Sequence, residues 1–270
     1  MPFDFSDRVV LVTGGGSGIG ESCARAFHAA GAKVAIFGRT ASKLSSVADS
    51  LNASSKGSTR VREATVDISD DEAVASAVMA IMDEWGPIDH LVNSAADFVA
   101  AGIDATKKQW QRSLEVNVIA SAMLTANVAA EMRRGSTVIN ISSISAHIAQ
   151  PDRWTYNSSK GAIVELTRCQ AMDLAPRGIR VNCVSPGWIW TPEVEKAATG
   201  DRERRELAWG RFHMARRLGE PEEVAMPVLF LSSEFSSFIT ATELMVDGGY
   251  SSLGPEGLGD ESRFAGSEQS

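Results

Sequence analysis

The sequence has few cysteines, and they follow no pattern. Cys23, Cys169 and Cys183 are the only three among 270 residues, and neither metal-ligand nor redox spacing connects them. Scattered cysteines in odd number exclude a disulfide framework, so we expect reduced, mostly buried thiols of the kind that cytoplasmic proteins contain. The four histidines are equally dispersed, and no metal site is expected.

Long apolar runs and an excess of positive charge are also absent. The apolar run at residues 9–12 is too short for a signal-peptide core, and no stretch approaches the length of a membrane span. Acidic residues outnumber basic ones by 34 to 26, and the net charge of −8 argues against a nucleic acid or an anionic membrane as partner. The sequence therefore predicts a cytoplasmic protein without nucleic-acid or membrane partners.

Short apolar strands alternate with amphipathic helical patterns along the chain. The apolar residues of each helical stretch share one face, as Cys23, Phe27 and Ala30 do after the first strand. Because the strands are apolar almost throughout, both faces of the sheet must be covered. Strands are expected at residues 9–12, 34–37, 60–66, 88–92, 137–141, 179–184 and 243–246.

This alternation predicts a single-domain α/β fold of the Rossmann type. Right-handed crossovers would make it a doubly wound parallel seven-stranded sheet with helices on both faces. We expect one dinucleotide-binding and catalytic domain over residues 1–250. The tail at residues 251–270 is rich in glycine, serine and acidic residues, and is expected to be a loop or an extension that covers a partner.

A glycine-rich segment comes directly after the first strand. Gly14, Gly18 and Gly20 permit a tight turn, a close approach of the backbone to a pyrophosphate, and close packing of the following helix. The start of that helix would present free N–H groups to the phosphates. An ordinary surface turn is the alternative, but the strand before and the helix after favour a dinucleotide site. Its cofactor-binding residues are expected to be Gly14, Ser17, Gly18, Ile19 and Gly20.

The residues after the second strand bear on the choice of dinucleotide. A carboxylate there would bind the ribose hydroxyls and repel a 2′-phosphate, but this chain has Arg39 and Thr40. Arg39 can pair with a 2′-phosphate through two hydrogen bonds, and Thr40 and Lys43 are within reach. The alternative is that Arg39 is only a solvated cation. We predict a preference for NADP(H), with NAD(H) as the second candidate.

Two later strand ends complete the expected cofactor site. Asp67, after the third strand, can accept a hydrogen bond from the adenine amino group, while Ile68 packs against the ring. Asn93 ends the fourth strand, and small residues after it would let the chain pass beneath the ribose. For Asn93, a structural role that ties strand ends together is an equal alternative to cofactor contact.

A tyrosine and a lysine four residues apart open a later helix, so Tyr156 and Lys160 share one face. A phenol with a pKa near ~10 is a poor base at neutral pH. The ammonium of Lys160 and a positive nicotinamide ring would favour phenolate, so that Tyr156 can exchange a proton with an alcohol or ketone oxygen. Ser143 lies just past the fifth strand and can hydrogen-bond the developing alkoxide. By itself the Tyr-x-x-x-Lys pair is common by chance, and the glycine loop and serine give it meaning.

With these motifs the chain resembles the short-chain dehydrogenase/reductase family from residue 7 to about residue 250. The matching segments are residues 13–20, Asp67, residues 93–96, Asn117, Ser143, Tyr156 with Lys160, and residues 186–191. One departure is Asn-Ser-Ala-Ala at residues 93–96, where the family commonly has Asn-Asn-Ala-Gly. This departure concerns local backbone detail and leaves the chemistry unaffected.

The resemblance implies roles for further residues. The catalytic set would be Asn117, Ser143, Tyr156 and Lys160, with Asn117 kinking its helix and holding a water that feeds protons to Lys160. The nicotinamide carboxamide would be anchored by the backbone of Ile189 and the hydroxyl of Thr191. The family also implies a homotetramer with the helices of Asn117 and Tyr156 near a subunit contact.

Substrate should lie between the loops that follow the fourth, fifth and sixth strands. Aromatic walls suit an apolar or ring-shaped substrate face, although packing of a lid or a subunit contact explains the tryptophans equally well. Residues 192–217 are expected to form a charged helical lid, whose arginines are better explained by a solvated face than by an anionic substrate. The expected substrate-binding residues are Ser143, Ser145, Trp154, Tyr156 and Trp188, with Phe98, His147, Gln150 and Trp190 as further candidates.

The sequence thus predicts an NAD(P)-dependent oxidoreductase that acts on a secondary alcohol, sugar or ketone. A 3-oxoacyl-carrier-protein reductase is an alternative; the acidic net charge argues against it, but a basic patch of Arg133, Arg134, Arg168 and Arg177 argues for it. A non-catalytic dinucleotide-sensing or scaffold protein is an alternative of another class. Such a protein needs the glycine loop but not the proton relay.

Overall fold

The computed structural model describes residues 3–55 and 61–258 of the chain. Its helices and strands are β1 (Val9–Thr13), α1 (Gly18–Ala29), β2 (Lys33–Gly38), α2 (Ala41–Ser54), β3 (Val61–Thr65), α3 (Asp71–Trp85), β4 (His90–Asn93), α4 (Lys107–Leu114), the π-helical turn η1 (Glu115–Ile119), α5 (Ala120–Ala129), β5 (Thr137–Ile141), the 3-10 turn η2 (Ile144–Ala146), α6 (Trp154–Leu174), β6 (Arg180–Pro186), α7 (Pro192–Ala197), α8 (Arg202–Gly210), α9 (Pro221–Ser232) and β7 (Glu243–Val246).

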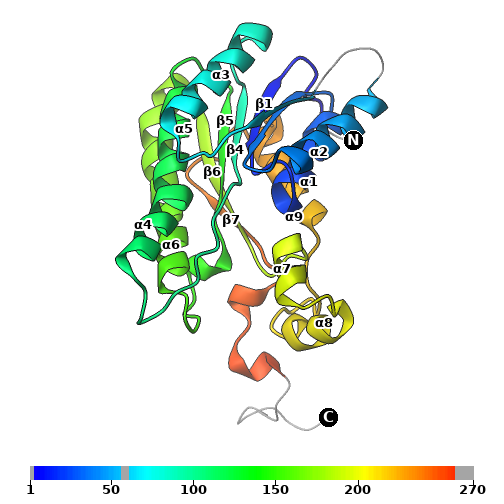
Figure 1. Ribbon diagram of the computed structural model, residues 1–270, viewed down its shortest axis with the longest axis vertical. Coiled ribbons are helices and arrows are strands. Elements are labelled where there is room, and N and C mark those ends of the chain that lie inside the picture. The colour runs from blue at the N-terminus through cyan, green and yellow to red at the C-terminus, as the bar shows by residue number, and fades with distance from the viewer. Residues whose placement is uncertain (1–2, 56–60, 259–270) are drawn as a thin grey trace.

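The seven strands form one sheet in the order β3-β2-β1-β4-β5-β6-β7, and every neighbouring pair is parallel. Helices α3, α4, α5 and α6 cover one face, and α1, α2 and α9 cover the other (Figure 1). The order reverses between β1 and β4, and such a reversal opens a crevice at the carboxyl ends of the strands. The prediction of a doubly wound Rossmann-type sheet is confirmed, and the crevice defines where a ligand binds in this fold.

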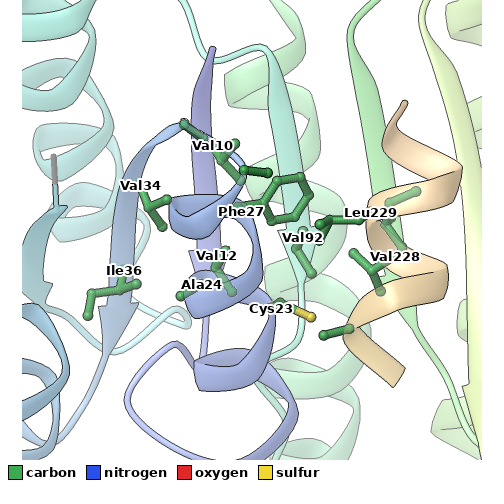
Figure 2. Close-up of a cluster of buried hydrophobic side chains, with 14 of the residues drawn as sticks. Val10, Val12, Cys23, Ala24, Phe27, Val34, Ile36, Val92, Val228 and Leu229 are labelled. Carbon is green, nitrogen blue, oxygen red and sulfur yellow. The ribbon is translucent and has the colours of Figure 1, made fainter. Parts of the chain in front are cut away.

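The core lies in two layers because side chains alternate across each strand. On β1, Val10 and Val12 face the layer beneath α1, α2 and α9, while Val9 and Leu11 face the layer beneath α3, α5 and α6. Figure 2 shows the first layer, in which Phe27 of α1 is fully buried among strand residues and side chains of α9. Burial on both faces explains why the strands are apolar throughout.

One strand boundary needs a small correction, and the thiols are mostly buried, as expected. The fourth strand begins at His90 rather than at residue 88, because residue pairing with β1 and β5 starts at His90, although the backbone of Asp89 already hydrogen-bonds Val9 and Thr137 and Ile88 is buried. Cys23 and Cys183 are buried, but Cys169 is exposed on α6. All three thiols are free.

Several features bear on the remaining expectations. In residues 3–55 and 61–258, no helix is long and apolar enough to cross a membrane. The same residues contain no group of three or more His, Cys, Asp or Glu side chains placed to hold a metal ion. Of the expected C-terminal extension, residues 250–252 and 255–258 form short 3-10 turns, and residues 259–270 lie outside the described residues.

Candidate active site

The glycine loop has a shape that only glycine permits. A Cβ on Gly20 would lie 2.3 Å from the carbonyl oxygen of Gly14, and one on Gly14 would lie 3.0 Å from the Cα of Ala95. Gly14 and Gly18 also have positive φ angles of 70° and 55°. Gly18 faces Thr191, since a Cβ there would meet the Thr191 Cγ2 at 3.3 Å. Because these glycines have no side chains, the space between the ends of β1, β4 and β6 stays open and forms a cradle that fits a pyrophosphate.

The run of small residues after β4 is held against this loop. The hydroxyl oxygen of Thr13 accepts hydrogen bonds from the backbone N–H groups of Ser94 and Ala95, each at 3.0 Å. Asn93 is buried, and its amide donates to Thr125 and to Asn140 of β5. Its bonds therefore tie β4 to α5 and β5, and its Oδ1 has no protein partner.

Four charged side chains lie at the expected adenosine end. Arg39 lies 3.7 Å from Asp97, and Arg112 contacts both Asp97 at 2.8 Å and Asp67 at 3.5 Å. Burial favours protonation of Asp67, but hydrogen bonds from Ser69 and the charges of Arg112 and Arg39 outweigh it, so its pKa is lowered. Asp97 and Arg112 were missed by the sequence reasoning, since nothing in their spacing indicates that they meet Arg39 and Asp67.

A hollow of about 340 Å³ adjoins the outer side of the glycine loop. Gly16 and Ser17 line it together with Lys43 and with Pro192 at the start of α7. Thr40 precedes α2 as its N-cap residue and makes no side-chain capping bond. Ile68 is buried against Ala95, Val116 and Ala120.

Helix α6 and the end of β5 bring the expected catalytic side chains together. Lys160 is buried, and its Nζ donates a 2.9 Å hydrogen bond to the carbonyl oxygen of Ile141. The same Nζ lies 5.6 Å from the centre of the Tyr156 ring. Ser143 caps η2 by accepting from the N–H of Ser145. Its hydroxyl lies near enough to the phenol of Tyr156 to lower the pKa of that phenol by hydrogen bonding.

Burial shifts the pKa of both Tyr156 and Lys160. Burial of the Tyr156 phenol raises its pKa, and this outweighs the lowering by the Ser143 hydrogen bond and the charge of Arg153. The expected lowering of this pKa by Lys160 together with an oxidised nicotinamide stays a prediction. Its own burial lowers the Lys160 pKa from 10.5 to about 8. Burial within the protein thus keeps the phenol of Tyr156 protonated at neutral pH.

Asn117 lies in the π-helical turn η1 between α4 and α5, which agrees with the expected kink in this helix. Its Oδ1 accepts from the N–H of Asp97 at 2.7 Å, and its Nδ2 donates to the Asp97 carbonyl and to the Ser159 hydroxyl. Asn117 thereby fastens the loop after β4 to helix α6. This position puts Phe98 beside the tyrosine, with ring centres of Phe98 and Tyr156 4.7 Å apart.

Aromatic rings form one side of the space around Tyr156. Trp188, from the loop after β6, stacks on Trp209 of α8 with ring centres 4.9 Å apart. The guanidinium of Arg153 lies over both Phe98 and Trp188, at 5.0 and 5.3 Å from their centres. Arg153 was not singled out from the sequence, although its place three residues before Tyr156 at the start of α6 was a usable signal.

Other expected substrate-binding residues line a hollow that Arg153 shares. Trp154 is 52% exposed and lines this hollow of about 540 Å³ with Ser145, Gln150, His147 and Arg153. Because residues two apart on a helix point in nearly opposite directions, Trp154 does not face the same way as Tyr156. His147 makes a 2.7 Å contact with Glu243 of β7.

The expected lid segment is helical in two pieces, α7 and α8. Thr191 caps α7 by accepting from the N–H of Val194, and the buried Ile189 forms a bridge with Gly219. Arg202 of α8 lies over Trp190 and pairs with two carboxylates, those of Glu206 and Glu220. These pairs agree with a solvated, mixed-charge helix.

A glycine cradle at the reversal point of the sheet, with a serine, tyrosine and lysine at its edge, defines a dinucleotide-dependent oxidoreductase. Comparisons with known proteins give the family. A sequence model described as enoyl-(acyl carrier protein) reductase matches residues 14–251. The chain belongs to the short-chain dehydrogenase/reductase family of oxidoreductases, whose members bind NAD(P).

Individual relatives cover nearly the whole chain. Carbonyl reductase [NADPH] 2 of Sus scrofa is 35% identical over 254 residues, which are 93% of this chain and 99% of the relative. L-Xylulose reductase of Bos taurus is 36% identical over 254 residues, with the same coverage. The crystal structure of L-sorbose reductase from Gluconobacter frateurii, in complex with NADPH and L-sorbose, has a TM-score of 0.86 and 31% identity, covering 94% of this chain and 100% of that one.

Proposed function

We propose that the protein transfers a hydride between a nicotinamide and a secondary alcohol, sugar or ketone carbon, with Tyr156 as general acid and base. The observation that carries this proposal is the convergence of Tyr156, Ser143 and Lys160 at the carboxyl end of β5 beside the glycine cradle. A bound nicotinamide supplies or accepts the hydride and, when oxidised, places a positive charge in the site. Because burial raises the Tyr156 pKa, that charge matters for forming phenolate.

The protein's side chains then have distinct tasks. In the oxidation direction Tyr156 takes the alcohol proton, and in the reduction direction it returns a proton to the carbonyl oxygen. Ser143 hydrogen-bonds the same oxygen and steadies the charge that develops on it. Lys160 is held by the Ile141 carbonyl, and its ammonium would hold the nicotinamide ribose when the cofactor is bound. Asn117 keeps the loop after β4 and helix α6 in register.

We propose NADP(H) as the preferred cofactor. Positive charge gathers where a 2′-phosphate would lie: Arg39 after β2, Lys43 beside the glycine loop, and the N-terminus of α2. The carbonyl and sorbose reductases named above are described with NADPH. Asp97 opposes this preference, because its carboxylate lies 3.7 Å from Arg39 and would compete with a 2′-phosphate for the guanidinium. Asp67, Ile189 and Thr191 would make further contacts with the bound cofactor.

Absorbance of the reduced nicotinamide tests both proposals. A panel of alcohols and ketones is measured in both directions with both cofactors, in the wild type and in Tyr156→Phe and Arg39→Asp. We expect Tyr156→Phe to abolish turnover while dinucleotide still binds, and Arg39→Asp to weaken NADP(H) more than NAD(H). Unchanged turnover in Tyr156→Phe rejects the mechanism, and faster turnover with NAD(H) in the wild type rejects the cofactor preference.

The structure weakens the carrier-protein alternative. Arg177 donates to the carbonyl oxygens of Ala130 and Met132, and Arg168 pairs with Glu165, so half of the basic patch is used within the protein. A scaffold function is opposed by the assembled proton relay.

We also propose a homotetramer in the cytoplasm. Large apolar side chains are exposed along α5 and α6, among them Met123, Trp154 and Met172, and association of these helices would cover them. Free thiols suit the cytoplasm. A monomeric mass by light scattering contradicts the tetramer.

A further inference from the structure

The arginine beside Tyr156 has no role in the mechanism above. Arg153 is the residue just before α6, and its guanidinium lies between two rings that come from different loops. Phe98 follows β4 and Trp188 follows β6, and the guanidinium carbon is 5.0 and 5.3 Å from their centres. Stacking occupies the faces of a guanidinium and leaves the N–H groups at its edge available for a planar acceptor.

Within residues 3–55 and 61–258, Arg153 has no ion-pair partner closer than 4.0 Å. Arg112 contacts two aspartates and Arg202 contacts two glutamates. The carboxylate adjacent in sequence, Asp152, is directed elsewhere, because its Oδ1 lies 2.8 Å from where a Cβ on Gly102 would stand. Arg153 therefore presents an uncompensated positive charge.

This charge lies in the substrate space rather than in the cofactor space. The Phe98 ring packs edge-on against Tyr156 while it supports Arg153, so both side chains contact the same ring. The charge of Arg153 is also one of the influences that lower the Tyr156 pKa. Trp188 continues the wall through its stacking on Trp209. The result is a cation set in an aromatic wall next to the proton-exchanging phenol.

We propose that Arg153 is the anion-binding residue of the substrate pocket, so that the substrate is an oxo or hydroxy compound carrying a carboxylate and a flat or apolar face. The guanidinium edge binds the carboxylate through charge-assisted hydrogen bonds, while Phe98 and Trp188 contact the flat face. This inference rests on the proposed function, because it assigns the substrate class of that site. The lid arginine Arg202 is excluded from this role by its own carboxylate partners.

Binding of matched probes tests the assignment without relying on turnover. Phenylacetate and 3-phenylpropanoate are compared with phenylacetamide and 3-phenylpropanamide by calorimetric titration of protein saturated with NADP⁺. Each pair differs only in charge. We expect the wild type to bind the carboxylates about 10-fold or more tighter than the amides. Arg153→Gln should remove this preference, and Arg153→Lys should keep part of it.

A matched control separates local charge from net charge. Arg168→Gln also removes one positive charge from α6, at an exposed position paired with Glu165, and should leave both the preference and the activity unchanged. Equal binding of carboxylate and amide by the wild type, including no binding of either, overturns the assignment. A preference that survives in a folded Arg153→Gln overturns it as well. If Arg153→Gln does not fold, the assignment is tested by the carboxylate preference of the wild type and of Arg153→Lys.

The outcome can be told apart from failure of the proposed function. Tyr156→Phe should lose turnover but retain the carboxylate preference. Tyr156-dependent turnover without any preference would leave the proposed function in place and reject the substrate class. A carboxylate preference without turnover of any alcohol or ketone would support the anion-binding role of Arg153 and reject the proposed function.

Discussion

Replacing Lys160 by methionine is expected to stabilise the protein at neutral pH while it abolishes activity. The ammonium of Lys160 is buried, and its pKa is lowered from 10.5 to about 8. At about 1.4 kcal/mol per pKa unit, keeping this group charged in the folded protein costs about 3 kcal/mol. Methionine has a similar length and no charge, but it loses the hydrogen bond from the charged ammonium to Ile141, worth about 2 kcal/mol. The net gain should be about 1 kcal/mol.

The pH dependence provides the specific signature. Below pH 8 the lysine is protonated in both the folded and the unfolded state, and the full cost is present. Between pH 8 and pH 10.5 only the unfolded chain holds the proton, so the stability of the wild type rises with pH. Above that window the cost is gone. The advantage of Lys160→Met should therefore shrink as pH rises from 7 to 10.

Urea unfolding followed by tryptophan fluorescence at pH 7 and pH 10, at one protein concentration, measures this difference. Lys108→Met, which removes an exposed lysine at the start of α4, is the control and should show no such change. The reasoning is refuted if Lys160→Met is less stable than the wild type at pH 7. It is also refuted if the difference between the two proteins is the same at both pH values.

Three further predictions concern packing, the glycine loop and acid stability. Phe27→Ala, at a fully buried position, should lower the free energy of unfolding by about 3–5 kcal/mol in urea titrations, and a loss below about 1 kcal/mol contradicts the core described here. Gly20→Ala would place a Cβ 2.3 Å from the Gly14 carbonyl oxygen and should abolish dinucleotide binding in a fluorescence titration; an unchanged Kd argues against the cradle. Burial lowers the His90 pKa from 6.5 to about 3, so stability is lost as pH falls through that range, and His90→Leu should be less acid-sensitive; an identical acid midpoint counts against this.

The fold followed from local patterns because its main determinants are local. Apolar strands that alternate with amphipathic helices leave few arrangements other than a covered parallel sheet. Strand positions agree to within about two residues, and the helix faces were recovered because burial imposes a period of 3.6 residues. The glycine loop could be predicted equally well, since the sequence itself shows that positions 14 and 20 are glycines without a Cβ.

The candidate site also has a part that local patterns predicted and a part that they did not. Tyr156 and Lys160 are placed together by their spacing on one helix, and Ser143 by its position at a strand end. The Arg39–Asp97–Arg112 contacts and the two rings around Arg153 join segments that are distant in the chain, and no local pattern encodes them.

The sequence by itself determined the sheet, the cradle and the placing of Tyr156 beside Lys160, because each depends on neighbouring residues and on the period of one element. Only the tertiary structure decided the electrostatics. Burial raises the pKa of Tyr156 and lowers that of Lys160, and both directions depend on which loops close over α6. The uncompensated charge of Arg153 is likewise a product of packing, since Asp152 beside it in sequence points to another loop.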